Sequence, residues 1–172
     1  LLAPLDYTNL LLFISGVSDP NCADRIDFAR EEDLLYYWLN KSAGRIFIYF
    51  GTTTPKDSPY AKHKRRMEEM IQKYTDYWLI FRIGPIKRRD GLGNTFYDFA
   101  RRRILNDEEF TLYTGESRPL LEAMDLYRFV AHWLKGPSFS CCISFDGPWI
   151  PVEQIVHDLE TELNKKAKYR TK

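Results

Sequence analysis

The chain has 172 residues, of which 44% are hydrophobic and 15% aromatic, enough for the core of one domain with a small lobe. Its 25 Lys and Arg residues nearly balance its 24 Asp and Glu residues, so the charge indicates neither a nucleic-acid nor a membrane partner. Three cysteines fit neither a disulfide framework nor a metal site, and no apolar stretch is long enough for a transmembrane helix, which together favour a cytoplasmic protein.

Strands and helices alternate along the chain. In chain order, the predicted elements are a strand over 10–15, a helix over 27–39, a strand over 45–50, a helix over 59–74, a strand over 76–83, a helix over 94–104, a short strand over 110–113, a helix over 120–134, a strand over 138–144 and a helix over 151–166. Continuous apolar runs are typical of strands buried on both faces. The alternation predicts an α/β fold, a three-layer sandwich with a mostly parallel sheet.

The helix over 59–74 has clear signals at its start. Ser58 suits the N-cap, and Pro59 suits the first helical position. Met67, Met70 and Ile71 are expected to point inward from this helix. The basic tail at residues 165–172 is expected to fray.

The same helix carries Tyr60 and Lys64, a Tyr-x-x-x-Lys pair that follows the threonines at residues 52–54. Residues four apart share a helical face, so the Lys64 ammonium is expected to lie beside the phenol and to lower its pKa. Such a phenol can act as a general acid or base, and a threonine hydroxyl could bond the same oxygen. The alternative is the exposed start of an amphipathic helix. His63 is expected to face solvent, on a different helical face from Tyr60.

Other motifs follow in a fixed order. Residues 82–85 read Arg-Ile-Gly-Pro after an apolar run, Arg118 precedes Asp125 by seven residues, and residues 148–155 read Pro-Trp-Ile-Pro-Val-Glu-Gln-Ile. Together with the Tyr-x-x-x-Lys segment, this order over residues 9–163 resembles the extended branch of the short-chain dehydrogenase/reductase superfamily. That branch comprises NAD-dependent epimerases, dehydratases and reductases of nucleotide sugars.

The resemblance implies an NAD- or NADP-dependent oxidoreductase or epimerase that acts on a nucleotide sugar. Tyr60 would be the acid/base, and Lys64 would lower its pKa and contact the nicotinamide ribose. Thr52 or Thr53 would orient a substrate hydroxyl.

Arg118 is the expected substrate-binding residue. The resemblance places the family's phosphate-binding arginine there, and a guanidinium fork suits a nucleotide diphosphate. The alternative is a surface ion pair with Glu116 or Glu122.

The resemblance also implies a domain organisation. Residues 1–85 would form a partial Rossmann-like cofactor domain, and residues 86–172 would contribute a substrate lobe and the last strand of the sheet. Gly16, Gly84 and Pro85 would belong to the cofactor site.

The chain departs from the family in two ways. Family members begin with a strand–Gly-x-x-Gly-x-x-Gly–helix unit that seats the dinucleotide pyrophosphate, and this chain has no such motif. Its nearest glycine pair, Gly91 and Gly93, reads as a surface loop. Only six residues separate Thr53 from Tyr60, fewer than the family usually has. Either the site is shortened or the native protein has further segments. A degenerate, non-catalytic binding or scaffold subunit is the alternative function.

A homodimer is expected from the same resemblance. Family members commonly pack the helix that carries Tyr-x-x-x-Lys and the helix before it into a four-helix bundle, here residues 27–39 and 59–74. The apolar side chains expected at this interface are Tyr36, Tyr37, Met67 and Met70.

Overall fold

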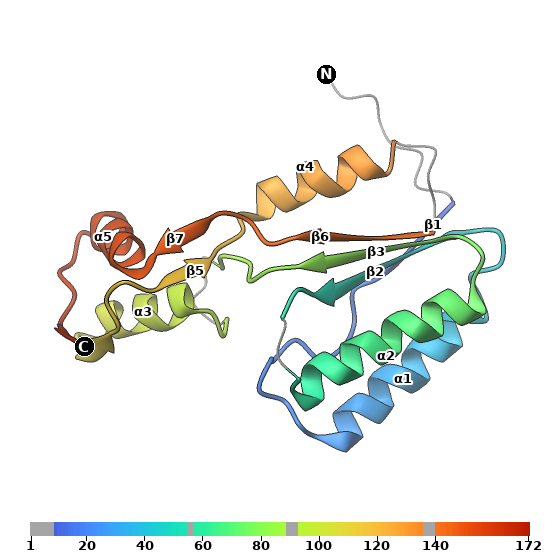
Figure 1. The fold of residues 1–172 in the computed structure, drawn as a ribbon, viewed down its shortest axis with the longest axis horizontal. Helices are drawn as coiled ribbons and strands as arrows, with labels where there is room; N and C mark the ends of the chain where they lie inside the picture. Colours follow the sequence, from blue (N-terminus) through green and yellow to red (C-terminus); the bar gives the residue numbers. More distant parts are fainter. Residues whose placement is uncertain (1–8, 55–56, 89–92, 136–139) are drawn as a thin grey trace. The chain divides into compact units, whose positions relative to one another are not determined.

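A four-stranded parallel sheet organises the first part of the chain in the computed structural model, which describes residues 9–54, 57–88, 93–135 and 140–172. In spatial order its strands are β1 (Leu10–Phe13), β2 (Ile46–Thr52), β3 (Trp78–Ile83) and β6 (Cys141–Phe145). Leu10 pairs with Ile46, and Leu79 pairs with Cys141. The predicted parallel α/β sheet is therefore confirmed (Figure 1).

The chain divides into two units. The first contains the sheet and comprises the residues up to Ile83 together with Tyr127–Phe145. The second comprises Gly84–Leu126 and Asp146–Lys172. The glycine Gly91, for which the sequence predicts a surface loop, lies outside the described residues.

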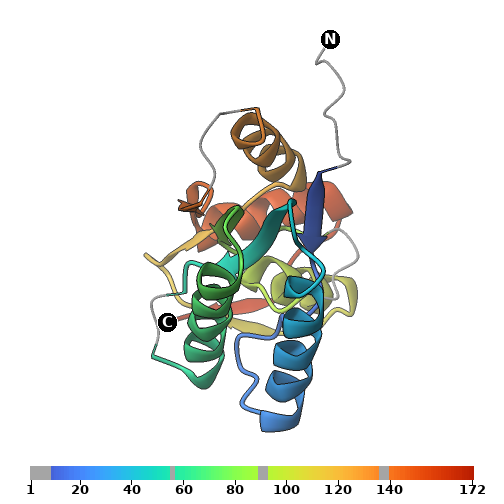
Figure 2. The ribbon, with the colours of Figure 1, turned by 90° about the vertical axis from the view of Figure 1, so that its right-hand side faces the viewer.

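Helices cover both faces of the parallel sheet. On one face α1 (Arg25–Leu39) and α2 (Pro59–Tyr74) lie side by side, as both views of the ribbon show (Figures 1 and 2). On the other face, α4 (Ala123–Trp133) packs through Phe129, Val130 and Trp133. Successive strand residues point to opposite faces, so Phe47 packs toward α1 and α2 whereas Ile48 packs toward α4. The three-layer arrangement follows from this alternation.

The start of α2 is determined locally. The Ser58 hydroxyl accepts a hydrogen bond from the Ala61 backbone N–H at 3.2 Å, and Pro59 is the first helical residue, as predicted. Met67 and Ile71 are fully buried against the sheet, and Met70 is partly buried there. Because the cap fixes where the helix begins, it also fixes Tyr60 in its first turn.

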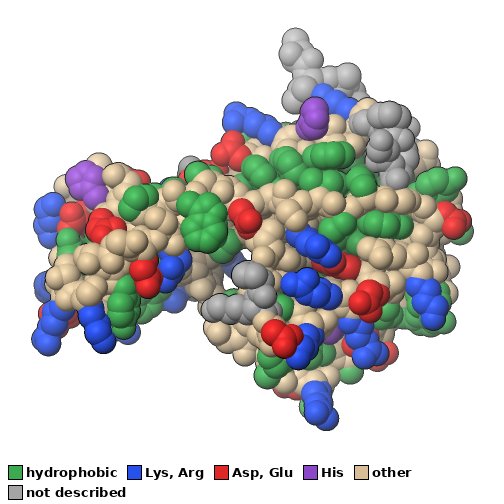
Figure 3. Space-filling view, viewed as in Figure 1, with side chains coloured by type: hydrophobic (Ala, Val, Ile, Leu, Met, Phe, Trp, Pro, Cys, Tyr) green, Lys and Arg blue, Asp and Glu red, His purple; other side chains and the backbone are tan. Residues whose placement is uncertain are grey.

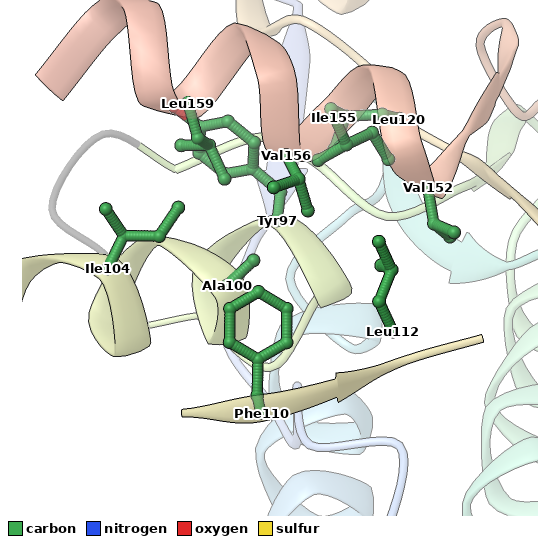
Figure 4. Close-up of a cluster of buried hydrophobic side chains, with 10 residues drawn as sticks. All are labelled: Tyr97, Ala100, Ile104, Phe110, Leu112, Leu120, Val152, Ile155, Val156 and Leu159. Carbon is green, nitrogen blue, oxygen red and sulfur yellow. The ribbon is translucent and has the colours of Figure 1, made fainter. Parts of the chain in front are cut away.

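The second unit has its own hydrophobic core between two helices and a short strand. These elements are α3 (Phe96–Leu105), α5 (Val152–Leu163) and β4 (Phe110–Leu112). Figure 4 shows the side chains that fill the space between them. They are Tyr97, Ala100, Ile104, Phe110, Leu112, Leu120, Val152, Ile155, Val156 and Leu159.

Three short strands of the second unit are absent from the sequence prediction, and they correct it. β8 (Tyr169–Thr171) pairs in parallel with β4, so the C-terminal tail does not fray as expected. β5 (Ser117–Pro119) pairs in antiparallel fashion with β7 (Trp149–Pro151). Each strand has only three residues, too few to give a recognisable pattern, and each forms because a partner distant in sequence satisfies its backbone.

Charge on the surface is mixed. On the face shown in Figure 3, Lys and Arg side chains are interspersed with Asp and Glu side chains. An ion pair between Lys166 and Glu160, at 3.0 Å, is an example of opposite charges that meet in the second unit. Within the described parts of the chain, no helix is long and apolar enough to cross a membrane, and no cluster of three or more metal-ligating side chains occurs.

Candidate active site

The carboxyl end of β2 brings a threonine to the first turn of α2. The Thr52 hydroxyl is a hydrogen-bond partner of the Tyr60 phenol, and its oxygen also lies at hydrogen-bond distance, 2.8 Å, from Thr54 Oγ1. Tyr60 itself is only 8% exposed. Thr53 contributes a backbone N–H to the Ile83 carbonyl at 3.3 Å. Of the two predicted threonines, the structure thus places Thr52 on the phenol.

Lys64 lies one turn after Tyr60, as the spacing predicts, but it binds a different group. It is buried, and its Nζ donates a hydrogen bond to Glu31 Oε1 at 2.8 Å. The ammonium lies 5.7 Å from the centre of the Tyr60 ring and 5.6 Å from the centre of the Tyr49 ring. The pair Tyr60–Lys64 is therefore part of a larger buried cluster centred on Glu31.

Glu31 comes from α1 and is 2% exposed. Besides Lys64, its carboxylate accepts hydrogen bonds from His63 Nε2 at 3.0 Å, from the Tyr49 hydroxyl at 3.3 Å and from the Val17 backbone N–H at 2.8 Å. These donors come from α2, from β2 and from the turn after β1. A buried carboxylate requires such partners, because an unpaired charge in the interior is costly.

The partners also decide the charge of Glu31. Burial alone would raise the pKa of Glu31, but the hydrogen bond from His63 and the charge and hydrogen bond of Lys64 outweigh it. They hold the pKa of Glu31 at about 2, below its ordinary value of 4.5. Glu31 is therefore a carboxylate throughout the neutral range, and it forms a buried ion pair with Lys64.

The pKa of Tyr60 shifts in the opposite direction from the sequence prediction. Burial raises its pKa above the ordinary value of 10.0, and the negative charge of Glu31 raises it further, while the hydrogen bond with Thr52 lowers it. The expectation that Lys64 lowers the pKa of Tyr60 is wrong, because the charge of Lys64 is directed to Glu31. At neutral pH Tyr60 is consequently a neutral phenol, which can donate a proton.

His63 does not face solvent, so the sequence prediction for it is also wrong. It is 5% exposed, and its ring stacks on Phe28 of α1 with 4.3 Å between ring centres. Residues three apart share a helical face as well as residues four apart, so His63 and Tyr60 are both turned inward.

Gly16 borders the same cluster. Its φ angle is 136°, and a Cβ atom added to it would lie 2.3 Å from the Glu31 carboxylate. A glycine is needed here to make room for the buried glutamate. A role of Gly16 in cofactor binding stays a prediction.

Gly84 and Pro85 belong to the second unit, where they contact other parts of the chain. A Cβ atom on Gly84 would lie 2.6 Å from the Asp146 carbonyl oxygen, and the Pro85 carbonyl accepts a hydrogen bond from the Leu121 N–H at 2.9 Å. These contacts explain both residues as part of the fold. Their assignment to a cofactor site stays a prediction.

Arg118 lies on β5 of the second unit. It is half exposed and forms an ion pair with Glu116, one of the two partners that the sequence left open. The side chain is close to solvent and presents a guanidinium that a phosphate could bind. Its role in binding a diphosphate stays a prediction.

Sequence reasoning missed Glu31, although a signal was present. Glu31 lies three residues after Phe28 and four before Leu35, both of which face inward on α1. An acidic residue in the apolar stripe of a helix indicates a buried partner of opposite charge.

Comparison with known proteins reveals similarity of fold alone. No protein-family model matches the chain, and no curated protein sequence matches it. Among solved structures, UDP-N-acetylglucosamine 4-epimerase from Bacillus cereus has a TM-score of 0.77 at 15% identity over 95% of this chain. MoeE5 in complex with UDP-glucuronic acid and NAD has a TM-score of 0.75 at 11% identity over 95% of this chain. UDP-glucose 4-epimerase from Thermus thermophilus, in complex with NAD, has a TM-score of 0.72 at 16% identity over 94%.

The chain spans 65% of the length of the first two of these structures and 64% of the third. It thus shares a Rossmann-like fold with these three structures over about two thirds of their length.

Proposed function

We propose that this chain is part of an NAD- or NADP-dependent nucleotide-sugar epimerase, dehydratase or reductase of the extended short-chain dehydrogenase/reductase superfamily. The observation that carries the proposal is the Thr52–Tyr60 hydrogen bond, with Lys64 one helical turn on, at the end of a parallel strand. Open parallel sheets bind ligands outside the carboxyl ends of their strands, where this group lies. The fold shared with the UDP-sugar epimerases supports the same reading.

In this proposal Tyr60 is the general acid/base. Its neutral phenol would give a proton to an oxygen of the sugar or receive one from it, and Thr52 would hold the phenol and orient that oxygen. The low exposure of Tyr60 keeps water from competing for the proton.

The donors at Lys64 fit the ribose end of a nicotinamide dinucleotide. An ammonium has three N–H donors and Glu31 accepts one of them, which leaves donors suited to ribose hydroxyls. When bound, the dinucleotide would supply hydride transfer. The chain has no Gly-x-x-Gly-x-x-Gly motif, so the proposal assigns the pyrophosphate to residues outside these 172.

Arg118 is proposed to bind the diphosphate of the nucleotide sugar, through a guanidinium that is half exposed on β5. Arg118→Ala in the complete natural protein should raise KM for the nucleotide sugar and leave dinucleotide affinity unchanged. Arg170→Ala, which removes another exposed arginine of the second unit, should change neither quantity.

Tyr60→Phe in the complete natural protein tests the central assignment. Turnover should fall by about 10²–10⁴, because the proton transfer is lost. Affinity for NAD or NADP by calorimetry should remain, because the ring is kept. The matched control is Tyr36→Phe, at a half-exposed tyrosine of α1, which should leave both quantities unchanged. Full activity in Tyr60→Phe would refute the assignment.

A second candidate is a non-catalytic family member that binds or scaffolds other molecules. The observation that favours it is the buried Glu31–Lys64 pair, which commits the lysine to an internal partner. Calorimetry separates the two candidates. If the complete natural protein produces no heat with either NAD or NADP, the enzyme proposal fails and the binding or scaffold function takes its place.

A further inference from the structure

The Glu31 carboxylate of α1 contacts side chains of α2 and β2, the two elements that carry the candidate site. The sequence does not predict Glu31 as a residue of this site. Its side chain is 1% exposed, and it bonds Lys64 Nζ at 2.8 Å. The carboxylate also lies against Gly16, where an added Cβ atom would be 2.3 Å from it. A charge buried in this way acts strongly on its neighbours, because the interior screens it less than water does.

We propose that Glu31 is a positioning residue, which binds the Lys64 ammonium and thereby keeps Tyr60 as a neutral, proton-donating phenol. The consequence for catalysis rests on the proposed function. The effect on Tyr60 does not rest on it, since it is a property of the folded chain alone.

The groups that face this pair come from several elements. Glu31 faces Lys64 and His63 on α2, Tyr49 on β2 and the Val17 N–H. On its own helix, Glu32 lies 3.8 Å from His63 Nδ1 and 2.9 Å from Arg66.

Tyr60 is influenced by three groups. Glu31 and Asp19 raise the pKa of the phenol through their charges, after the larger effect of burial, and Thr52 lowers the pKa through its hydrogen bond. Removing the charge of Glu31 should therefore favour the phenolate. It also releases the Lys64 ammonium from its carboxylate, which favours the phenolate as well.

The test is a pH titration of the full-length protein labelled with ¹³Cζ-tyrosine and followed by NMR. Tyr60→Phe assigns the Tyr60 resonance. In the wild type, Tyr60 should titrate above the ordinary tyrosine value of 10.0. In Glu31→Gln, which keeps the size of the side chain, the titration of Tyr60 should move to lower pH. The matched control Glu32→Gln removes the neighbouring charge on the same helix and should leave Tyr60 unchanged.

A second variant covers the case in which Glu31→Gln does not fold. The double variant Glu31→Gln with Lys64→Met removes both charges, so no charge is left unpaired. Because the ammonium is lost together with the carboxylate that neutralises it, the titration of Tyr60 should stay close to that of the wild type. A folded Glu31→Gln variant in which Tyr60 titrates at unchanged or higher pH would overturn the proposal. A double variant in which the titration moves clearly to lower pH would also overturn it, because Glu31 would then act on the phenol without Lys64. So would a wild type in which Tyr60 titrates at or below 10.0.

The pH profile of kcat/KM adds a functional measurement. If Tyr60 must be protonated to donate, the rate falls as pH rises through its pKa, so Glu31→Gln should shift the alkaline limb to lower pH. A shifted titration in a protein without turnover would reject the proposed function and leave the role of Glu31 intact. An unshifted titration in an active enzyme would reject the role of Glu31 alone.

Discussion

At the scale of single residues, the buried pair of Glu31 and Lys64 dominates the first unit. Both side chains are almost fully buried, and their N–O distance is 2.8 Å. Desolvation of two charges offsets much of their attraction, so the intact pair contributes little net stability. Loss of one partner is different, because the other charge is then left buried and unpaired.

Lys64→Met should therefore be strongly destabilising. We expect a loss of about 3–5 kcal/mol in the free energy of unfolding, measured by urea denaturation. Lys62→Met, on the same helix, removes a lysine whose side chain is 66% exposed and pairs with Asp57. Its cost should be about 0–1 kcal/mol. Equal effects of the two substitutions would contradict the buried ion pair.

The depressed pKa of Glu31 predicts an acid-dependent loss of stability. The carboxyl has a pKa of about 2 in the folded chain and 4.5 as its ordinary value. Its contribution is thus fully present above pH 4.5 and is lost as the pH falls from 4.5 toward 2. The loss should amount to about 3 kcal/mol, from about 1.36 kcal/mol for each unit of pKa.

Urea denaturation between about pH 6 and about pH 3 measures this dependence. Glu31→Gln, which has no carboxyl to protonate, should lose less stability over the same range than the wild type. A variant with the same slope as the wild type would show that other carboxyl groups cause the acid dependence.

At the scale of elements, the N-cap of α2 connects local sequence to the site. The Ser58 hydroxyl accepts a hydrogen bond from the backbone N–H of Ala61, and the first turn of the helix places Tyr60 beside Thr52. The sequence predicts this boundary because a serine N-cap followed by proline depends only on neighbouring residues. The sequence prediction ends α5 three residues too late, because the left-handed Asn164, with φ of 48°, stops the helix after Leu163.

Ser58→Ala should lower the free energy of unfolding by about 1 kcal/mol, because one helical N–H loses its acceptor. Ser58→Asp keeps an acceptor at the same position and should be close to neutral. Thermal and urea denaturation of both variants measure the difference. If alanine and aspartate have the same effect, the hydroxyl does not cap the helix.

At the scale of the whole molecule, the predicted dimer needs a revised set of contacts. Met67 is fully buried in the hydrophobic core against the sheet, so its expected place at the interface is wrong. Met70 is partly buried in the same cluster. Tyr36 and Tyr37 of α1 remain about half exposed, as does Tyr74 of α2. The homodimer through α1 and α2 stays a prediction that rests on these aromatic side chains.

Light scattering after size-exclusion chromatography should give the mass of a dimer at micromolar concentration. The double substitution Tyr36→Glu and Tyr37→Glu should convert it to a monomer, because two charges would be buried in the interface. Tyr113→Glu, at an equally exposed tyrosine of the second unit, should leave the dimer intact. A wild type that elutes with the mass of a monomer would contradict the predicted homodimer.

The sequence by itself determined the helices, the four strands of the parallel sheet and their order along the chain. Apolar runs predicted all four strands of the parallel sheet, and the Tyr-x-x-x-Lys spacing placed Lys64 one turn from Tyr60. The threonine contact was also foreseen, because a strand that ends just before a helix brings their adjoining ends together. These features depend on residues that are close along the chain.

Only the tertiary structure decided the chemistry of the site. Glu31 lies 33 residues before Lys64, and their ion pair arises because α1 and α2 pack side by side. The same contact buries His63 and reverses the predicted direction of the pKa of Tyr60. A pKa depends on every charge and every layer of protein that surrounds a group in space. The spacing of Tyr60 and Lys64 could therefore predict that they lie close together. It could not predict the Glu31 carboxylate, which binds Lys64 and raises the pKa of Tyr60.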